Sequence, residues 1–172
     1  GVSKCLLSKW DFIIWDSHCN QTCKNLLHHF FELEPSSETC IGVFIDFPLG
    51  IDREEEYTLQ AMGGWMELTG HPELEPLQVG GYCSSHLVGA HAATGGLLAT
   101  LTLKENKKHI VQINVLTVVV SALEGAYSTY LATGEERRRV GNRHHALAPM
   151  AIMPCEDGWS FLGAPVDEKW AL

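Results

Sequence analysis

A short polar stretch holds the densest set of groups capable of covalent chemistry: Ser84, Ser85 and His86, followed by His91. A serine hydroxyl becomes a nucleophile when an imidazole takes its proton and an acid such as Glu56 orients that imidazole. Neither serine stands in a Gly-x-Ser-x-Gly turn. Polar residues at the start of a helix commonly cap it, so we expect Ser84 or Ser85 to be the N-cap of the following helix.

A second group of residues offers metal-ligand atoms near the beginning of the chain. His18, Cys19 and Cys23, with His28 or His29, carry the nitrogen and sulfur atoms that zinc prefers. Their spacing contains no paired Cys-x-x-Cys, no second cluster and no His-Glu-x-x-His helix. We therefore expect no metal site.

A basic cluster stands out in an otherwise acidic chain. Guanidinium groups form paired hydrogen bonds with phosphate, so Arg138 and Arg143 are candidates to hold a phosphorylated ligand. A basic surface loop, or a salt bridge to a Glu-rich segment of another subunit, is the competing interpretation. The cluster consists of Arg137, Arg138, Arg139, Arg143, His144 and His145.

Length and charge set the broad class. A chain of 172 residues that is 45% hydrophobic can bury one sizeable core, so we expect one domain, or one domain and part of another. The formal net charge of −9 argues against broad binding to nucleic acid or to an anionic membrane, because both need a basic face.

The cysteines and the two ends indicate where the chain belongs. The 6 cysteines follow no disulfide or metal pattern, so we expect free thiols in a reducing compartment, by default the cytoplasm. The start, Gly1 to Lys4, is neither an initiator methionine nor a signal peptide, and the end follows directly on a hairpin. We expect a piece of a longer protein.

The elements that must position these groups alternate between strands and helices. Apolar runs with β-branched and aromatic residues predict buried strands at 10–15 and 40–47, with a helix at 25–34 between them. A strand, helix and strand at this spacing form a right-handed parallel crossover. A further helix is expected at 57–69, closed by Gly70, and a Pro- and Gly-bearing loop at 73–81.

The second half of the chain predicts two apolar helices and a hairpin. The helices cover 86–103 and 115–131, with an alternating strand at 109–114 between them. Glycines and histidines within the first favour a buried helix of a globular protein over a membrane span. Asp157-Gly158 is typical of the tight turn of a β-hairpin.

Four motifs in this order resemble the family III CoA-transferases. The helix at 57–70 ends in Leu-Thr-Gly, Val79-Gly80 precedes the helix that contains Gly89, and 109–114 matches the strand that follows. Residues 130–134 and the loop 141–149 with its hairpin resemble the entry to the family's small domain. The resemblance implies an α/β fold: a partial large domain at 1–140, Rossmann-like with long buried helices, and the start of the small-domain hairpin at 141–172.

The resemblance also assigns site residues. In the family an aspartate after the Val-Gly turn attacks an acyl-CoA thioester, and that position falls on Ser85, which cannot form the required mixed anhydride. No acid lies between Glu75 and Glu105 to replace it. The acid at the family's helix start falls near Glu56, where a solvated helix N-terminus is the competing interpretation. The family's arginine after the first strand falls on His18.

Two functions follow from the resemblance. The first is a catalytically degenerate domain that binds acyl-CoA or serves as the structural half of a homodimer or of a complex with a companion CoA-transferase subunit. The second is an active CoA-transferase, or a racemase-like enzyme in which Glu56 exchanges a proton with His86 or His91. In both, the cofactor is a coenzyme A thioester contacted by His18, Arg138 and Arg143, with no metal, nucleic acid or membrane involved.

Overall fold

The computed structural model describes residues 12–16, 40–47, 56–102, 108–145 and 147–163. The predicted helix at 25–34, the candidate zinc ligands, among them His18, and both ends of the chain lie outside this part. The predictions made for them stay predictions.

Three of the predicted strands form one parallel sheet. Its strands are β1 (Phe12–Asp16), β2 (Cys40–Asp46) and β3 (Lys108–Asn114), in the order β1-β2-β3. Phe12 lies opposite Ile41, and Cys40 lies opposite Lys108. Because parallel strands end at the same edge, polar residues that follow the apolar runs gather there: Asp16, Asp46 and Asn114.

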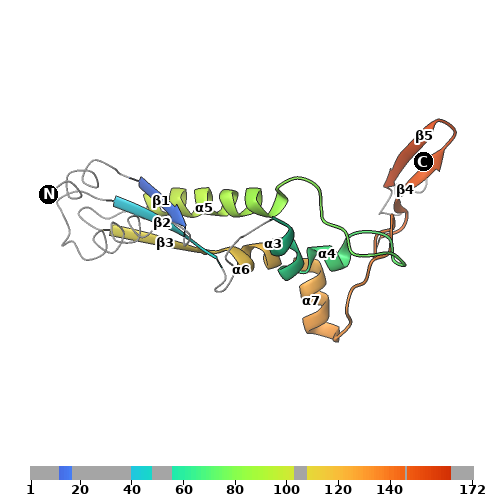
Figure 1. The fold of residues 1–172 in the computed structure, drawn as a ribbon, viewed down its shortest axis with the longest axis horizontal. Helices are drawn as coiled ribbons and strands as arrows, with labels where there is room; N and C mark the ends of the chain where they lie inside the picture. Colours follow the sequence, from blue (N-terminus) through green and yellow to red (C-terminus); the bar gives the residue numbers. More distant parts are fainter. Residues whose placement is uncertain (1–11, 17–39, 48–55, 103–107, 146, 164–172) are drawn as a thin grey trace.

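The long helix α5 (Cys83–Leu101) packs against β2 and β3 (Figure 1). Its buried positions recur every three or four residues, as one helix face requires, and are Ser84, Val88, Ala92, Gly96 and Ala99. Small residues let the helix approach the sheet closely, since a Cβ built on Gly95 would lie 2.7 Å from Val111 Cγ1. The helix begins three residues before the predicted start, at Cys83.

The predicted helix at 57–69 is two helices, α3 (Glu56–Met62) and α4 (Trp65–Leu68). The break falls at Gly63-Gly64, where Gly64 has a φ of 81°, a left-handed conformation that ends a helix and that glycine adopts without strain. The Trp65 indole donates a hydrogen bond to the Val119 carbonyl at 2.8 Å, which fixes α4 against the helix that contains Val119.

The predicted helix at 115–131 is also divided, into α6 (Val115–Ser121) and α7 (Glu124–Thr133). The amides of Ala122 and Leu123 bond to carbonyls three residues back, which tightens and ends α6. Asn114 caps α6, because its side chain accepts a hydrogen bond from the Thr117 amide at 2.9 Å. Within the described ranges no single helix has the length and hydropathy of a membrane span, although α6 and α7 meet the criterion as a pair bent by 79°.

Burial within the chain differs between the two apolar helical segments. One core cluster joins Leu59 and Val88 to α6, and a second joins Ile41 and Val43 to the small residues of α5. In contrast, α7 has no buried residue, and α5 exposes Leu97, Leu98 and Leu101. No described element packs over α7, so its burial by a partner or by another part of the protein stays a prediction.

The hairpin consists of β4 (Met150–Cys155) and β5 (Gly158–Gly163), which lie at the opposite end of the molecule from the sheet (Figure 1). Cys155 pairs with Gly158, so the two turn residues are Glu156 and Asp157. The predicted turn was one residue late, because Gly158 belongs to the ladder and opens β5.

Candidate active site

Glu56, the first residue of α3, accepts hydrogen bonds from the first turn of α5. Its Oε1 accepts from the Ser84 amide at 2.6 Å and from Gln60 Nε2 at 2.8 Å. Its Oε2 accepts from the Ser85 amide at 3.1 Å and from the Ser85 hydroxyl at 2.7 Å. A carboxylate from a distant part of the chain thus satisfies amides that the start of any helix leaves without intrahelical partners.

The prediction that Ser84 or Ser85 is the N-cap is wrong. Tyr82 is the N-cap residue and makes no side-chain cap bond, and both serines lie within the first turn. The Ser84 side chain is fully buried and its hydroxyl has no hydrogen-bond partner. The cap is supplied by Glu56 instead, which also suits the positive end of the helix dipole.

The charge state of Glu56 follows from these contacts. Glu56 is 8% exposed, so the interpretation that Glu56 is a solvated acid is wrong. Burial alone raises its pKa, but the hydrogen bonds from Gln60, Ser84 and Ser85 outweigh burial and lower the pKa to about 2. Glu56 is therefore a buried carboxylate that stays ionised far below neutral pH.

Gln60 connects Glu56 to the backbone of Val79 in the segment before α5, and it was not among the site residues predicted from the sequence. Its Oε1 accepts from the Val79 amide at 2.8 Å, and its Nε2 donates to the Val79 carbonyl at 3.1 Å as well as to Glu56. The amide side chain is fully buried. The sequence signal for this pair was the spacing of Glu56 and Gln60, because residues four apart are neighbours on the surface of a helix.

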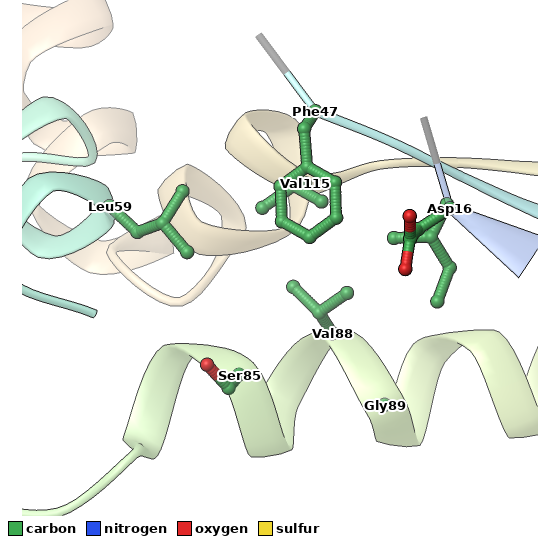
Figure 2. A pocket seen from close by; sticks show the side chains of 8 residues that line it. Asp16, Phe47, Leu59, Ser85, Val88, Gly89 and Val115 are labelled. Atoms are coloured by element: carbon green, nitrogen blue, oxygen red, sulfur yellow. The ribbon is translucent and has the colours of Figure 1, made fainter. Parts of the chain in front are cut away.

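A cavity of about 170 Å³ opens between α5 and the carboxyl edge of the sheet. Figure 2 shows the Val88 side chain pointing from α5 toward Phe47 and Val115, with Ser85 one turn earlier on the same helix. The Asp16 carboxylate lies across from α5 at the end of β1 (Figure 2). The lining residues are Asp16, Ile45, Phe47, Leu59, Ser85, Val88, Gly89 and Val115.

The histidines do not complete a hydrolytic triad. His86 Nδ1 lies 2.6 Å from the Tyr82 carbonyl oxygen, and His91 Nδ1 lies 2.9 Å from the Leu87 carbonyl oxygen. Both side chains are exposed, and neither imidazole bonds to Ser85 or Glu56. Among the described residues the arrangement is a serine hydrogen-bonded to a carboxylate, with no histidine positioned as a base.

The basic cluster divides into structural and free arginines. The Arg139 guanidinium donates to the carbonyls of Glu67 at 2.8 Å, His71 at 3.2 Å and Leu74 at 3.4 Å, and its Nη1 lies 3.3 Å from Glu67 Oε2. Arg139 therefore holds the end of α4 and the loop that follows it in place. By contrast, Arg138 and Arg143 are exposed and their side chains make no bond to any residue in the described ranges.

The described part of the chain contains no group of three His, Cys, Asp or Glu side chains that could hold a metal ion. Cys83 and Cys155 are free thiols.

Comparison with known proteins identifies the family. Residues 54–172 match the family model of CoA-transferase family III, and the chain belongs to this family. It spans about a quarter to a third of the length of the curated relatives that it matches, with 27%, 26% and 31% of the three described next.

The relatives are CoA-transferases by name. The chain is 33% identical over 110 residues (63% of the chain) to a succinyl-CoA:D-citramalate CoA-transferase of Chloroflexus aurantiacus. It is 32% identical over 101 residues (58% of the chain) to an acetyl-CoA:oxalate CoA-transferase of Acetobacter aceti. It is 25% identical over 130 residues (75% of the chain) to a succinate-glutarate CoA-transferase of Agrobacterium fabrum.

Solved structures share the fold. A CaiB/BaiF family protein from Brucella suis superimposes with a TM-score of 0.71 at 21% identity, covering 98% of this chain and 46% of that one. A hypothetical protein from Mycobacterium tuberculosis gives a TM-score of 0.72 at 17% identity, covering 97% of this chain and 46% of that one. The α/β architecture with a parallel sheet and helices is thus that of a partial family III domain.

Proposed function

We propose that this chain is the acyl-CoA-binding part of a family III CoA-transferase-like protein and that it forms no acyl-enzyme intermediate. The observation that carries the proposal is the pairing of Ser85, at the cavity, with the buried carboxylate of Glu56. A hydroxyl stands at position 85 in place of the expected carboxylate nucleophile, and that hydroxyl donates a hydrogen bond to Glu56 at 2.7 Å.

Serine chemistry is disfavoured by the weak basicity of its partner. Before it attacks a thioester, the Ser85 hydroxyl must give its proton to a base, and a general base works best when its pKa lies near the working pH. Glu56, with its pKa lowered to about 2, is far from that range. The same argument opposes the racemase-like alternative, in which Glu56 would remove a proton beside the thioester carbonyl.

Attack by Glu56 itself is disfavoured by its hydrogen bonds. Its two oxygens accept four hydrogen bonds from Gln60, Ser84 and Ser85, and an attacking oxygen must give up part of that set. Losing such contacts leaves buried donors unsatisfied, which costs about 1–3 kcal/mol for each group. The balance favours Glu56 as the residue that holds α3 and α5 together.

We place the coenzyme A thioester with its acyl end at the cavity and its phosphates at Arg138 and Arg143, with His18 as a further contact. The support for the phosphate site is that these two arginines are exposed and without side-chain partners in the described ranges, whereas Arg139 is occupied within the chain. Phosphate accepts the paired donors of a guanidinium.

We also propose that a second copy or a companion CoA-transferase subunit covers the exposed apolar surface. The support is the exposure of large apolar residues on α5, α7 and the hairpin, among them Leu101, Leu131 and Trp159. The division into a large-domain part at 1–140 and the beginning of a small domain at 141–172 is part of the proposal. So is a reducing compartment such as the cytoplasm, which suits the free thiols.

The test is trapping of an acyl-enzyme. The purified protein is incubated with an acyl-CoA donor and a carboxylate acceptor, and adducts are sought by mass spectrometry before and after treatment with hydroxylamine, which cleaves an acyl-enzyme bond. We expect none from the unmodified chain and none from Ser85→Asn, whose amide cannot form an anhydride. An adduct that disappears in Ser85→Ala would overturn the proposal, while an adduct gained only in Ser85→Asp would support the assignment of position 85.

A further inference from the structure

We propose that the cavity beside Ser85 selects an uncharged, apolar acyl group about the size of a benzene ring and rejects acyl groups that end in a carboxylate. This inference rests on the proposed function, which brings the acyl end of a CoA thioester to this cavity. It adds the chemical class of the acyl group.

The walls of the cavity are apolar and firmly packed. Leu59, Val88 and Val115 are 3%, 5% and 0% exposed and belong to one core cluster, which Ile45 and Phe47 pack against. Walls that are part of the core hold their shape, because core side chains are close-packed. The volume of about 170 Å³ is close to that of dry apolar cavities of roughly 150 Å³ that bind benzene.

The described lining of the cavity contains no cation. Among the described lining residues Asp16 is the charged one, and no Lys, Arg or His is present. Directly behind Ser85 stands the ionised carboxylate of Glu56, bonded to the Ser85 hydroxyl. A second carboxylate on the acyl group would enter an apolar space in which no described lining residue is a cation, and it would approach the like charge of Glu56.

This chemistry separates the chain from the relatives described above. Their names pair succinyl-CoA with citramalate, acetyl-CoA with oxalate, and succinate with glutarate, so each pair includes an acid with two carboxylates. A positive group at the far end of the acyl chain would stabilise the second carboxylate of such a substrate. The described lining residues of this cavity include no Lys, Arg or His.

Gly89 provides the means to test the assignment. It lines the cavity, and a Cβ added there meets no atom within 4 Å. Gly89→Leu therefore adds volume at the cavity without a clash at the Cβ. Ala90→Leu adds the same side chain at the next position of α5, which is exposed and does not line the cavity, and serves as the matched control.

The experiment measures the affinities of free CoA, benzoyl-CoA and succinyl-CoA for the purified protein by calorimetry. We expect benzoyl-CoA to bind roughly tenfold or more tightly than succinyl-CoA, since burying an aromatic group of this size is favourable by an amount that corresponds to at least that ratio. Gly89→Leu lowers benzoyl-CoA affinity about tenfold more than that of free CoA, and Ala90→Leu leaves the ratio unchanged.

Each contrary result has a separate meaning. Succinyl-CoA that binds as tightly as benzoyl-CoA, while free CoA also binds, overturns the selectivity alone. Equal losses of free CoA and benzoyl-CoA in Gly89→Leu show that the cavity holds the pantetheine arm, which also overturns the inference. Absence of binding by all three, free CoA included, overturns the proposed function and the inference with it.

Discussion

The Ser85 hydroxyl and the Ser85 amide donate to the same oxygen of Glu56, at 2.7 Å and 3.1 Å. One carboxylate oxygen therefore fixes both the backbone and the side chain of the residue that stands at the family's nucleophile position. The side chain at position 85 and the acid at position 56 form one unit, and a change at either must be judged by its effect on the other.

Glu56→Gln should lower the free energy of unfolding by about 2–3 kcal/mol, because one end of the new amide is a donor that faces the donating serine amides. Urea unfolding at neutral pH measures the change. Glu136→Gln is the matched control, since Glu136 is exposed, and it should change stability by less than about 0.5 kcal/mol. Equal effects of the two substitutions would contradict the role of Glu56.

The depressed pKa of Glu56 predicts a loss of stability in acid. A group whose pKa is lower in the folded state stabilises the fold above its unfolded value, here 4.5, and that contribution is lost as the pH falls toward about 2. The shift corresponds to about 3 kcal/mol. Unfolding measured between pH 6 and pH 3 should show a steeper decline in the unmodified protein than in Glu56→Gln, and parallel curves would rule the prediction out.

Ser85→Asp should be less stable than Ser85→Asn by about 1–3 kcal/mol at neutral pH, because it sets a second carboxylate beside Glu56. The like charge raises a pKa of the pair, so the difference between the two variants should shrink as the pH falls toward 4. Thermal unfolding of both variants at three pH values tests this. A difference that does not depend on pH would point to packing instead of charge.

Arg139→Gln should cost about 2 kcal/mol of stability, because three backbone carbonyls lose a charged donor. Glu67→Gln should cost less than about 0.5 kcal/mol, since the Glu67 side chain is 64% exposed. Arg138→Gln controls for the change of charge. If Arg138→Gln destabilises the protein as much as Arg139→Gln, the closure of α4 by Arg139 is not what matters.

Arg138 and Arg143 should instead govern CoA binding. Replacing either arginine with Glu is expected to weaken the binding of free CoA roughly tenfold or more, because a charge-assisted contact to phosphate is lost. Calorimetry in low and high salt gives the measurement, and unfolding gives the control, because neither change should alter stability. Unchanged affinity in the double variant would place the phosphates elsewhere.

Gly95→Ala and Gly89→Ala should move stability in opposite directions. At Gly95 the new methyl group would lie 2.7 Å from Val111 Cγ1, and overpacking of this kind costs about 1–3 kcal/mol. At Gly89 the space is open, and replacing glycine within a helix stabilises by up to about 1 kcal/mol. Melting temperatures of the two variants provide the comparison, and a loss of stability at both positions would contradict it.

The sequence predicted the elements whose signals are local. The three strands were found because their apolar, β-branched runs are short and end at polar residues. The two glycines at Gly63-Gly64 are a local signal for the break, which the prediction of one continuous helix at 57–69 does not use. The end of α6 carries no proline or glycine, so no local signal in the sequence predicted the hydrogen bonds from Ala122 and Leu123 that end it.

The site depends more on tertiary contacts. Glu56 and Ser84 are 28 positions apart, and the motif comparison located both regions without indicating that one caps the other. Asp16 could have been found, because ligands in open α/β sheets bind beyond the carboxyl ends of parallel strands and Asp16 ends the first strand. Arg139 could not be told from Arg138, since only the path of residues 71–74 decides which guanidinium meets the carbonyls.

The cap on α5 also makes two amide protons into reporters of the site. The protons of Ser84 and Ser85 are held by Glu56, which belongs to another helix, so they exchange with solvent deuterium only when α3 and α5 separate. Protection from exchange at the start of this helix should then match that of the core, although the ends of helices ordinarily fray. An occupant of the cavity would slow exchange at these two amides even if it never touches them.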